Sequence, residues 1–143
     1  METKQMPKLP WMEGNVTEFL ILTAMNPMVK KVSDEQNKQL MDSLLSLLEG
    51  DSINFLEQEG MYGGVYEKSV IILNQGSDYG QSLAKTFMQE SYVYGEWRDG
   101  QWHYKLIGQD GDVFSESDNI LFLKKRPADN WSQYKNIIYS IDF

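Results

Sequence analysis

The chain contains no cysteine and only one histidine among its 143 residues. Without cysteine it has no disulfide, no thiolate nucleophile and no sulfur ligand for zinc or an iron–sulfur cluster. The segment Asp110-Gly-Asp112 lacks the ligand spacing of a calcium loop, and we interpret it as a turn. We therefore expect no metal and no cofactor.

The single histidine also argues against a catalytic triad. His103 is predicted to lie beside Glu96 on an exposed strand face, whereas a triad needs a histidine aimed at a nucleophile in a cleft. Glu57, Glu59 and Glu67 are candidates for acid–base work, but glutamates are common on exposed strand surfaces. The catalytic residues, if the chain has any, are not identified by the sequence.

Basic residues are scarce as well, with 13 Lys and Arg against 21 Asp and Glu, for a net charge of −8. Binding to nucleic acid depends on neutralising phosphates, so we expect no nucleic-acid partner. An acidic surface keeps a small protein soluble. It also suits docking on a basic protein partner.

Long apolar runs are missing too. No stretch approaches the roughly 18 residues of a membrane span, and the first residues, METKQMPKLP, lack the apolar segment of a signal peptide. These absences, together with the lack of disulfides, lead us to expect no membrane association and a cytoplasmic location.

What the chain does contain is enough apolar and aromatic residues, including 4 Trp, 8 Tyr and 6 Phe, to build one folded domain over 1–143. We divide it into an extended N-terminal arm (1–16), a core (18–95) and a C-terminal extension (96–143). Prolines disfavour helix in the arm, and Trp11 is its predicted anchor.

The core is predicted to begin with a strand over residues 18–24. Its apolar run, Phe19 to Leu22, does not alternate, which favours a central strand covered on both faces. Pro27 ends this strand. A helix then begins at the capping box Ser33-Asp-Glu-Gln36, and Asn37 falls unexpectedly on its inward, apolar stripe.

Two strands, over 52–58 and 66–74, and a second helix complete the core; Ser77 is the predicted N-cap of this helix, which runs to about residue 89. Asp99-Gly100 then predicts a two-residue hairpin in which Trp97 faces Trp102. For the tail from Asp129 we favour a short helical turn followed by a closing strand.

This order of elements is ferredoxin-like, strand-helix-strand-strand-helix-strand. It predicts an α+β two-layer sandwich, with two helices on one face of a mainly antiparallel sheet and a C-terminal meander as an extension. A sheet of similar content with another strand order is the alternative.

Uncharged polar residues stand in unexpected places around the end of the first strand. If the strand from residue 66 pairs antiparallel beside the first strand, its beginning lies near that strand's end, and the polar side chains converge on one pocket. The predicted ligand-binding residues are Thr23, Asn26, Asn37, Glu67, Ser69 and Gln89. The structural alternative is that Asn26 and Asn37 cap backbone groups and hold the loop 26–32.

The runs FLILTAMNP, SDEQN, YEKSVIIL and LAKTFMQES resemble the bacterial domain family of unknown function 3293 over about residues 18–95. The matching positions are Thr23, Ala24, Asn26, Pro27, Ser33, Asn37, Glu67, Ser69, Leu83, Ala84, Phe87 and Gln89. Val70 departs from the family, which usually carries an aromatic residue there, and residues 96–143 lie outside the resemblance. The resemblance implies no activity; it implies that the polar positions above form the family's signature.

Two functions from different classes follow. The first is binding of a small polar ligand, nucleotide-like or amide-bearing, in a pocket at the end of the first strand, because Asn and Gln offer both donors and acceptors. The alternative is a non-catalytic, acidic inhibitor or regulator that binds a protein, similar in composition to those that phages and mobile elements direct at host systems. Its surface would be the acidic strands, the hairpin side with Tyr92, Tyr94 and Glu96, or the tail.

Overall fold

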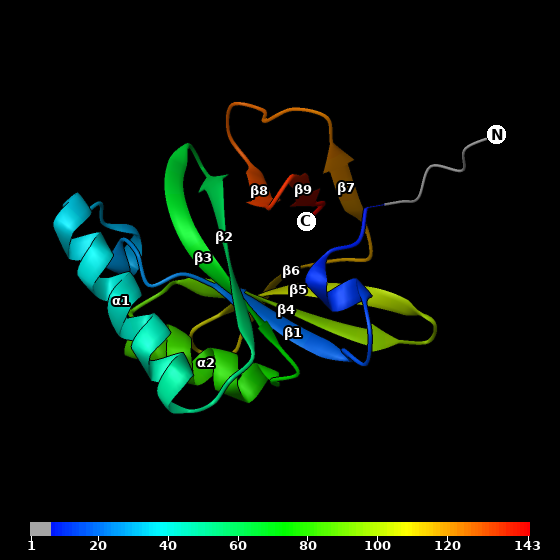
Figure 1. The fold of residues 1–143 in the computed structure, drawn as a ribbon, viewed down its shortest axis with the longest axis horizontal. Helices are drawn as coiled ribbons and strands as arrows, with labels where there is room; N and C mark the ends of the chain where they lie inside the picture. Colours follow the sequence, from blue (N-terminus) through cyan, green and yellow to red (C-terminus); the bar gives the residue numbers. More distant parts are fainter. Residues whose placement is uncertain (1–6) are drawn as a thin grey trace.

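The computed structural model describes residues 7–143, so the first part of the predicted N-terminal arm, residues 1–6, lies outside the described residues (Figure 1). The helices are α1 (Asp34–Gly50) and α2 (Ser77–Thr86), with 3₁₀ turns η1 (Pro10–Met12) and η2 (Pro27–Val29). The strands are β1 (Glu18–Leu22), β2 (Phe55–Tyr62), β3 (Val65–Leu73), β4 (Ser91–Arg98), β5 (Gln101–Gly108), β6 (Val113–Ser117), β7 (Ile120–Leu123), β8 (Trp131–Tyr134) and β9 (Ile137–Ile141).

The predicted two-layer, ferredoxin-like sandwich with a C-terminal meander is wrong. The strands form one mostly antiparallel sheet of nine strands, in the order β6-β5-β4-β1-β3-β2-β8-β9-β7, which curls into a half-barrel (Figure 1). The reason lies in the C-terminal strands. β5 and β6 extend the sheet beyond β4, but β8, β9 and β7 add to the opposite edge at β2. The sheet is therefore extended at both edges, and its twist makes it curve so that one face becomes concave.

The central strands are buried on both faces, as the apolar run of β1 predicts. On one face Leu20 and Leu22 pack with a cluster that includes Leu44 of α1 and Leu83 of α2. On the other face Phe19 and its neighbours meet the N-terminal arm and the C-terminal strands in a second cluster. That cluster is completely buried at Leu9, Trp11, Phe19, Ile71, Tyr104 and Tyr139. A two-layer sandwich leaves this second face open, which is the physical reason that the predicted class fails.

Trp11 anchors the arm in the second cluster. It is 1% exposed, and its indole stacks on the ring of Phe19 with centroids 4.0 Å apart and planes 10° apart. The ring of Phe19 lies over Gly95, where a Cβ atom would approach it to 2.0 Å. The glycine in β4 is therefore required so that this aromatic stack can lie flat against the sheet.

The hairpin prediction is confirmed, including its register. β4 and β5 pair Trp97 with Trp102 and Glu96 with His103, and both turn residues, Asp99 and Gly100, have left-handed backbone conformations. Tyr92 of β4, however, is 2% exposed, because it packs beneath α2 and donates a hydrogen bond to the carbonyl of Ser77 at 2.8 Å. It is therefore not available to a protein-binding surface on this hairpin.

Helix α1 begins at the predicted capping box. The Ser33 hydroxyl accepts a hydrogen bond from the Gln36 amide at 3.1 Å, and the Gln36 side chain accepts one from the Ser33 amide at 3.2 Å. For α2 the predicted cap at Ser77 is wrong. Gly76 is the N-cap, and the helix ends at Thr86.

The tail differs from the prediction as well. The predicted closing strand is present as β9, but the favoured helical turn from Asp129 is replaced by strand β8, because Trp131 and Ser132 pair with the free edge of β2. Within residues 7–143, no helix combines the length and the apolar character needed to cross a membrane.

Candidate functional site

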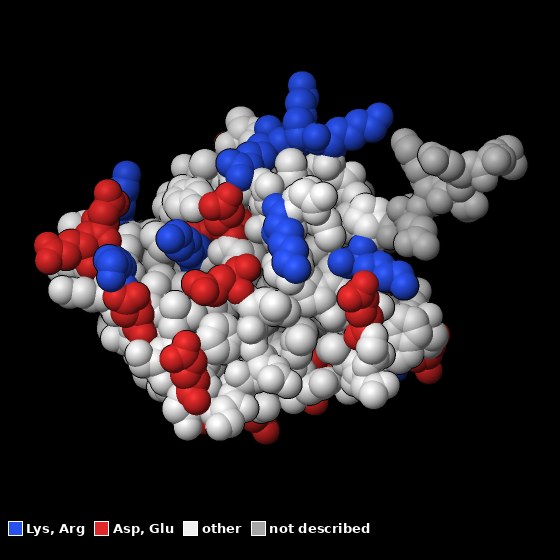
Figure 2. All heavy atoms as spheres, in the orientation of Figure 1, with Lys and Arg blue, Asp and Glu red and all other residues white. Residues whose placement is uncertain are grey.

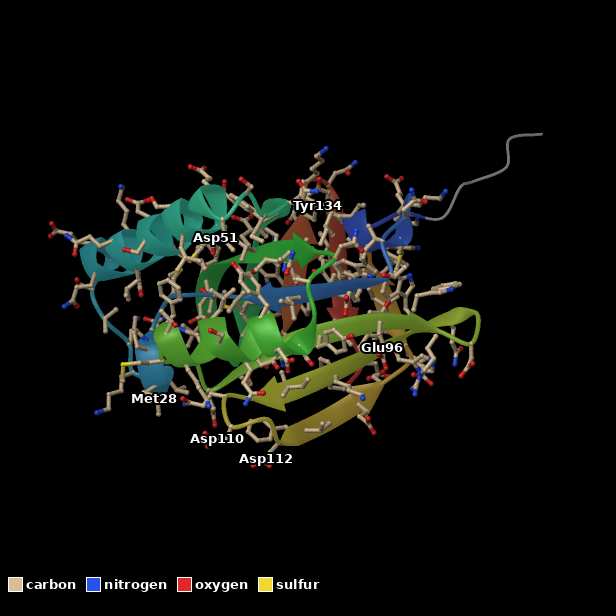
Figure 3. All side chains as sticks on the ribbon, turned by 90° about the horizontal axis from the view of Figure 1, so that it is seen from below. Met28, Asp51, Glu96, Asp110, Asp112 and Tyr134 are labelled. Atoms are coloured by element: carbon tan, nitrogen blue, oxygen red, sulfur yellow. The ribbon has the colours of Figure 1, made fainter. Side chains whose placement is uncertain are left out.

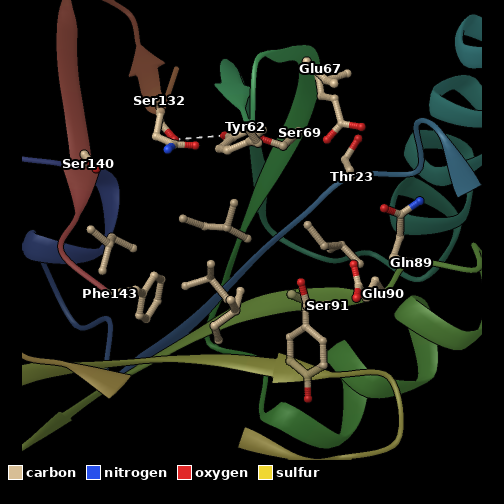
Figure 4. Close-up of a pocket in the computed structure, with 18 of the residues that line it drawn as sticks. Thr23, Tyr62, Glu67, Ser69, Gln89, Glu90, Ser91, Ser132, Ser140 and Phe143 are labelled. Carbon is tan, nitrogen blue, oxygen red and sulfur yellow. Dashed lines mark hydrogen bonds between the residues drawn. The ribbon is translucent and has the colours of Figure 1, made fainter. Parts of the chain in front are cut away.

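A cavity of about 660 Å³ opens at the end of β1, between the central strands and the C-terminal strands β8 and β9 (Figure 4). Strand pairing explains how residues distant in sequence meet there. The register joins Leu22 to Val70, so the start of β3 lies beside the end of β1, as expected for an antiparallel pair. The predicted residues that line the cavity are Thr23, Asn26, Glu67, Ser69 and Gln89. Asn37 is not among the lining residues.

Asn26 and Asn37 form a buried amide pair between the loop after β1 and helix α1. The Asn37 side-chain oxygen accepts a hydrogen bond from the Asn26 backbone amide at 2.8 Å, and the Asn37 side-chain nitrogen donates to Asn26 Oδ1 at 3.0 Å. Asn26 Oδ1 also accepts from the amide of Val32 at 3.2 Å. These contacts match the structural alternative, in which Asn26 and Asn37 bond to backbone groups and hold the loop 26–32. The inward amide of Asn37 holds the loop and does not face the cavity.

The amide pair also fixes the position of Glu67. Because Asn26 Oδ1 is occupied by two donors, the Asn26 side-chain nitrogen points the other way and donates to Glu67 Oε2 at 2.9 Å. Burial raises the pKa of the Glu67 carboxyl above its ordinary value of 4.5, and the hydrogen bond from Asn26 opposes this shift. Among residues 7–143, no basic side chain lies within ion-pair distance of this carboxylate.

The loop that carries Asn26 is strained. Asn26, Met28 and Val29 all have left-handed backbone conformations, and for a β-branched residue such as Val29, with φ of 61°, this conformation is rare. The Asn26 contacts and a hydrogen bond of 2.7 Å from the Met28 amide to the carbonyl of Met88 oppose the strain. Figure 3 shows Met28 at the same end of the molecule as Asp110, and Val29 borders the cavity.

Thr23 and Gln89 line the cavity while bonding to the backbone. The Thr23 hydroxyl donates to the carbonyl of Lys68 at 2.6 Å and accepts from the amide of Met25 at 3.0 Å. The Gln89 side-chain nitrogen donates to the carbonyls of Met25 at 3.0 Å and Phe87 at 3.1 Å. Both side chains thus tie the segment after β1 to its neighbours.

Ser69, one of the predicted residues, belongs to a second polar group whose other members were not predicted from the sequence. Its hydroxyl accepts from the Gln58 side-chain nitrogen at 3.1 Å, and Gln58 Oε1 accepts from the Tyr139 hydroxyl at 2.6 Å. Beside them, the hydroxyls of Tyr62 and Ser132 share a hydrogen bond of 2.9 Å (Figure 4). Burial raises the pKa of both the Tyr62 and the Tyr139 hydroxyl, which keeps them protonated as neutral donors.

Gly60 makes room for this second group. A Cβ atom at Gly60 would lie 2.4 Å from the Tyr62 hydroxyl oxygen and 2.6 Å from the carbonyl oxygen of Trp131. Gln58, Gly60 and Tyr62 alternate along β2 with outward residues, and Gln58 and Gly60 are buried. This alternation of inward polar residues was the signal in the sequence that could have identified them.

The charges around the cavity are mainly acidic. Its lining includes Glu67, Glu90 and Asp142 but only one basic residue, Lys31. His103 lies elsewhere, with one ring nitrogen 2.6 Å from Asp118 and the other 3.1 Å from the carbonyl of Arg98. In the described part of the chain, no group of three or more His, Cys, Asp or Glu is placed to hold a metal ion. The cavity thus offers hydrogen-bonding groups and negative charge.

Comparison with known families confirms the resemblance inferred from the polar motifs. Residues 22–91 match the model of the family described as "Protein of unknown function (DUF3293)". The matched segment includes all of the predicted ligand-binding residues but ends before β8 and β9. No protein among the curated proteins matches the chain.

Proposed function

We propose that this protein binds a small polar ligand in the cavity at the end of β1. Residues of the segment 22–91, which matches the DUF3293 family model, line this cavity together with residues of the C-terminal strands. We place this function in the cytoplasm. The ligand class is an amide-bearing compound or a nucleobase-like group, both of which exchange hydrogen bonds with amides and hydroxyls.

One observation carries the proposal. Thr23, Asn26, Glu67, Ser69 and Gln89 come from separate segments of the chain and line a single cavity. Its volume of about 660 Å³ lies within the range of about 300–1,000 Å³ that is typical of small-molecule sites. Apolar side chains such as Ile21 and Leu106 also line the cavity, and they would cover the less polar parts of a ligand.

The charge of the lining narrows the ligand class. Glu67, Glu90 and Asp142 would repel a phosphate group, and Lys31 is the one lining residue that would attract it. This balance favours a ligand without phosphate over a charged nucleotide. A nucleobase or an amide can use the hydroxyls of Tyr62 and Ser132 on the far wall.

The predicted docking of an acidic face on a basic protein gains no specific support from the surface. Figure 2 shows acidic and basic side chains interspersed on one face, with basic side chains gathered over the segment between β7 and β8. That segment contains Lys124, Lys125 and Arg126. The face therefore does not present a continuous acidic surface.

Mass spectrometry of metabolites that co-purify with the protein, followed by a melting-temperature screen of those found, tests the proposal. We expect a bound compound that raises the melting temperature. Ser140→Phe, which fills the cavity from β9, should abolish this shift. Ser46→Phe, the same change at an exposed position of α1, should retain it.

Retention of the compound by the filled variant at the wild-type level would show that binding occurs elsewhere. A screen in which no compound co-purifies or stabilises the wild type would contradict the proposal itself.

A further inference from the structure

Glu67 is the charged group of the cavity whose position is most fully determined. Its carboxylate is half-buried and faces the cavity beside Thr23 and Ser69 (Figure 4). Glu90 and Asp142 also line the cavity, but among residues 7–143 neither makes an ion pair or a side-chain hydrogen bond that would hold it. Glu67 is thus the acidic residue with a defined geometry at the site.

The position of the Glu67 carboxylate is set by two side-chain amides, Asn37 on helix α1 and Asn26 in the loop after β1. Asn37 is fixed by the backbone amide of Asn26, Asn26 is fixed by Asn37 and Val32, and the remaining nitrogen of Asn26 bonds to Glu67 Oε2. Each amide has one orientation that satisfies its partners, so the chain of bonds leaves Glu67 little freedom to rotate.

The other carboxylate oxygen of Glu67 remains open. Oε1 makes no hydrogen bond to any of residues 7–143, and no basic side chain in that range pairs with the carboxylate. A partly buried carboxylate without a cationic partner is costly, because it has lost part of its hydration and gained one neutral donor in return. A cationic donor placed in the cavity would supply the missing partner.

We propose that the cavity selects ligands with a cationic N–H donor, such as an ammonium, amidinium or guanidinium group, which bonds to Glu67 Oε1. This inference rests on the proposed function and names the charge of its ligand. The uncharged remainder of the ligand then lies toward the hydroxyls of Tyr62 and Ser132, which act as donors or acceptors as the ligand requires.

Three probes of nearly equal shape test the inference: benzamidine, benzamide and benzoate. Binding of each to the full chain is measured by NMR titration, with the backbone amide signals of Ser69 and Gln89 as reporters of the cavity. We expect wild type to bind benzamidine about tenfold more tightly than benzamide, and benzoate most weakly.

Glu67→Gln should remove the preference for benzamidine over benzamide, because the neutral side chain keeps its shape but loses its charge. Glu57→Gln is the matched control: it makes the same change at an exposed position of β2 outside the cavity, and it should retain the preference. A melting curve of each variant establishes that it is folded.

The outcomes separate this inference from the proposed function. Equal binding of benzamidine and benzamide at the reporter residues, or a preference that survives in Glu67→Gln, would overturn the role of Glu67 and leave the ligand cavity in place. If none of the three probes shifts the reporter signals, both the inference and the cavity as a binding site are contradicted.

Discussion

The cavity has two polar walls that are built differently. The amide wall consists of Asn26 and Glu67 and is held from behind by Asn37, whose side chain bonds to both the backbone amide and the side chain of Asn26. The hydroxyl wall consists of Tyr62, Ser69, Ser132 and Tyr139, and Gln58 behind it bonds to Ser69 and Tyr139. Hydroxyl hydrogens rotate to suit their partners, whereas an amide that must satisfy two neighbours cannot turn. We therefore expect the amide wall to present fixed hydrogen-bonding groups to the proposed ligand, and the hydroxyl wall to adapt to that ligand.

The two walls also differ in origin. The amide wall lies entirely within residues 22–91, which match the family model, whereas Ser132 and Tyr139 of the hydroxyl wall come from strands outside that match. We expect the amide wall to contribute more to stability, because its groups are tied to the backbone of a strained loop. Substitutions at each wall test this difference.

The largest effect is expected for Asn37→Ala, behind the amide wall. The change removes the acceptor of the buried Asn26 amide and the donor to Asn26 Oδ1, so the free energy of unfolding should fall by about 2–3 kcal/mol. Urea denaturation followed by circular dichroism measures it. The control is Gln39→Ala, an exposed change on the same helix, which should alter stability by less than about 0.5 kcal/mol.

A smaller effect is expected for Tyr139→Phe in the hydroxyl wall. The variant keeps the buried ring but loses the hydroxyl that donates to Gln58, which should cost about 1 kcal/mol. The same denaturation experiment applies. A loss as large as that of Asn37→Ala would remove the distinction between the two walls.

The smallest effect concerns Glu67 and depends on pH. The folded-state pKa of Glu67 is raised above 4.5, so the folded protein holds this proton more tightly than the unfolded chain does. Well below pH 4.5, Glu67 is protonated in both the folded and the unfolded state and has no effect on stability. As the pH rises past 4.5, the unfolded state ionises first. The wild type therefore loses stability until the pH passes the folded-state pKa.

Glu67→Gln lacks this titration. The stability of the variant relative to wild type should therefore increase as the pH is raised through that window and then stay constant. Melting temperatures of both proteins across a pH series measure the difference. A stability difference that does not change with pH would show that Glu67 has the same pKa in the folded and unfolded states.

Local signals in the sequence predicted local structure well. The capping box at Ser33 and the Asp99-Gly100 hairpin depend on residues within a few positions of one another, and both are present with the predicted partners. The antiparallel pairing of β1 with β3 also follows the prediction, and it is the pairing that brings Thr23, Glu67 and Ser69 to one cavity.

The predicted fold class failed where pairing is distant in sequence. Met61 of β2 pairs with Trp131 of β8, and no local pattern specifies that partner. The non-alternating run from Phe19 to Leu22 did indicate that a second face had to be covered, which is inconsistent with the two-layer class. The same lack of a local signal hid Ser132 and Tyr139 of the hydroxyl wall, because they reach the cavity only through this distant pairing.

The role of Asn37 could be predicted only in part. Helical spacing placed its side chain inward, which is correct, since it is 6% exposed. Its partner depends on the left-handed conformation of Asn26, and no periodicity in the sequence predicts that conformation. The hydrogen bonds of Asn37 therefore show that it positions Asn26, whereas the sequence predicted that Asn37 contacts the ligand.

The most direct test of the proposed cation site is the pKa of Glu67 itself, measured by NMR titration of its carboxyl carbon with and without benzamidine. We predict a pKa above 4.5 in the free protein and a decrease when the cation binds, because the ligand stabilises the ionised form. A pKa at or below 4.5 that benzamidine leaves unchanged would contradict the proposed site.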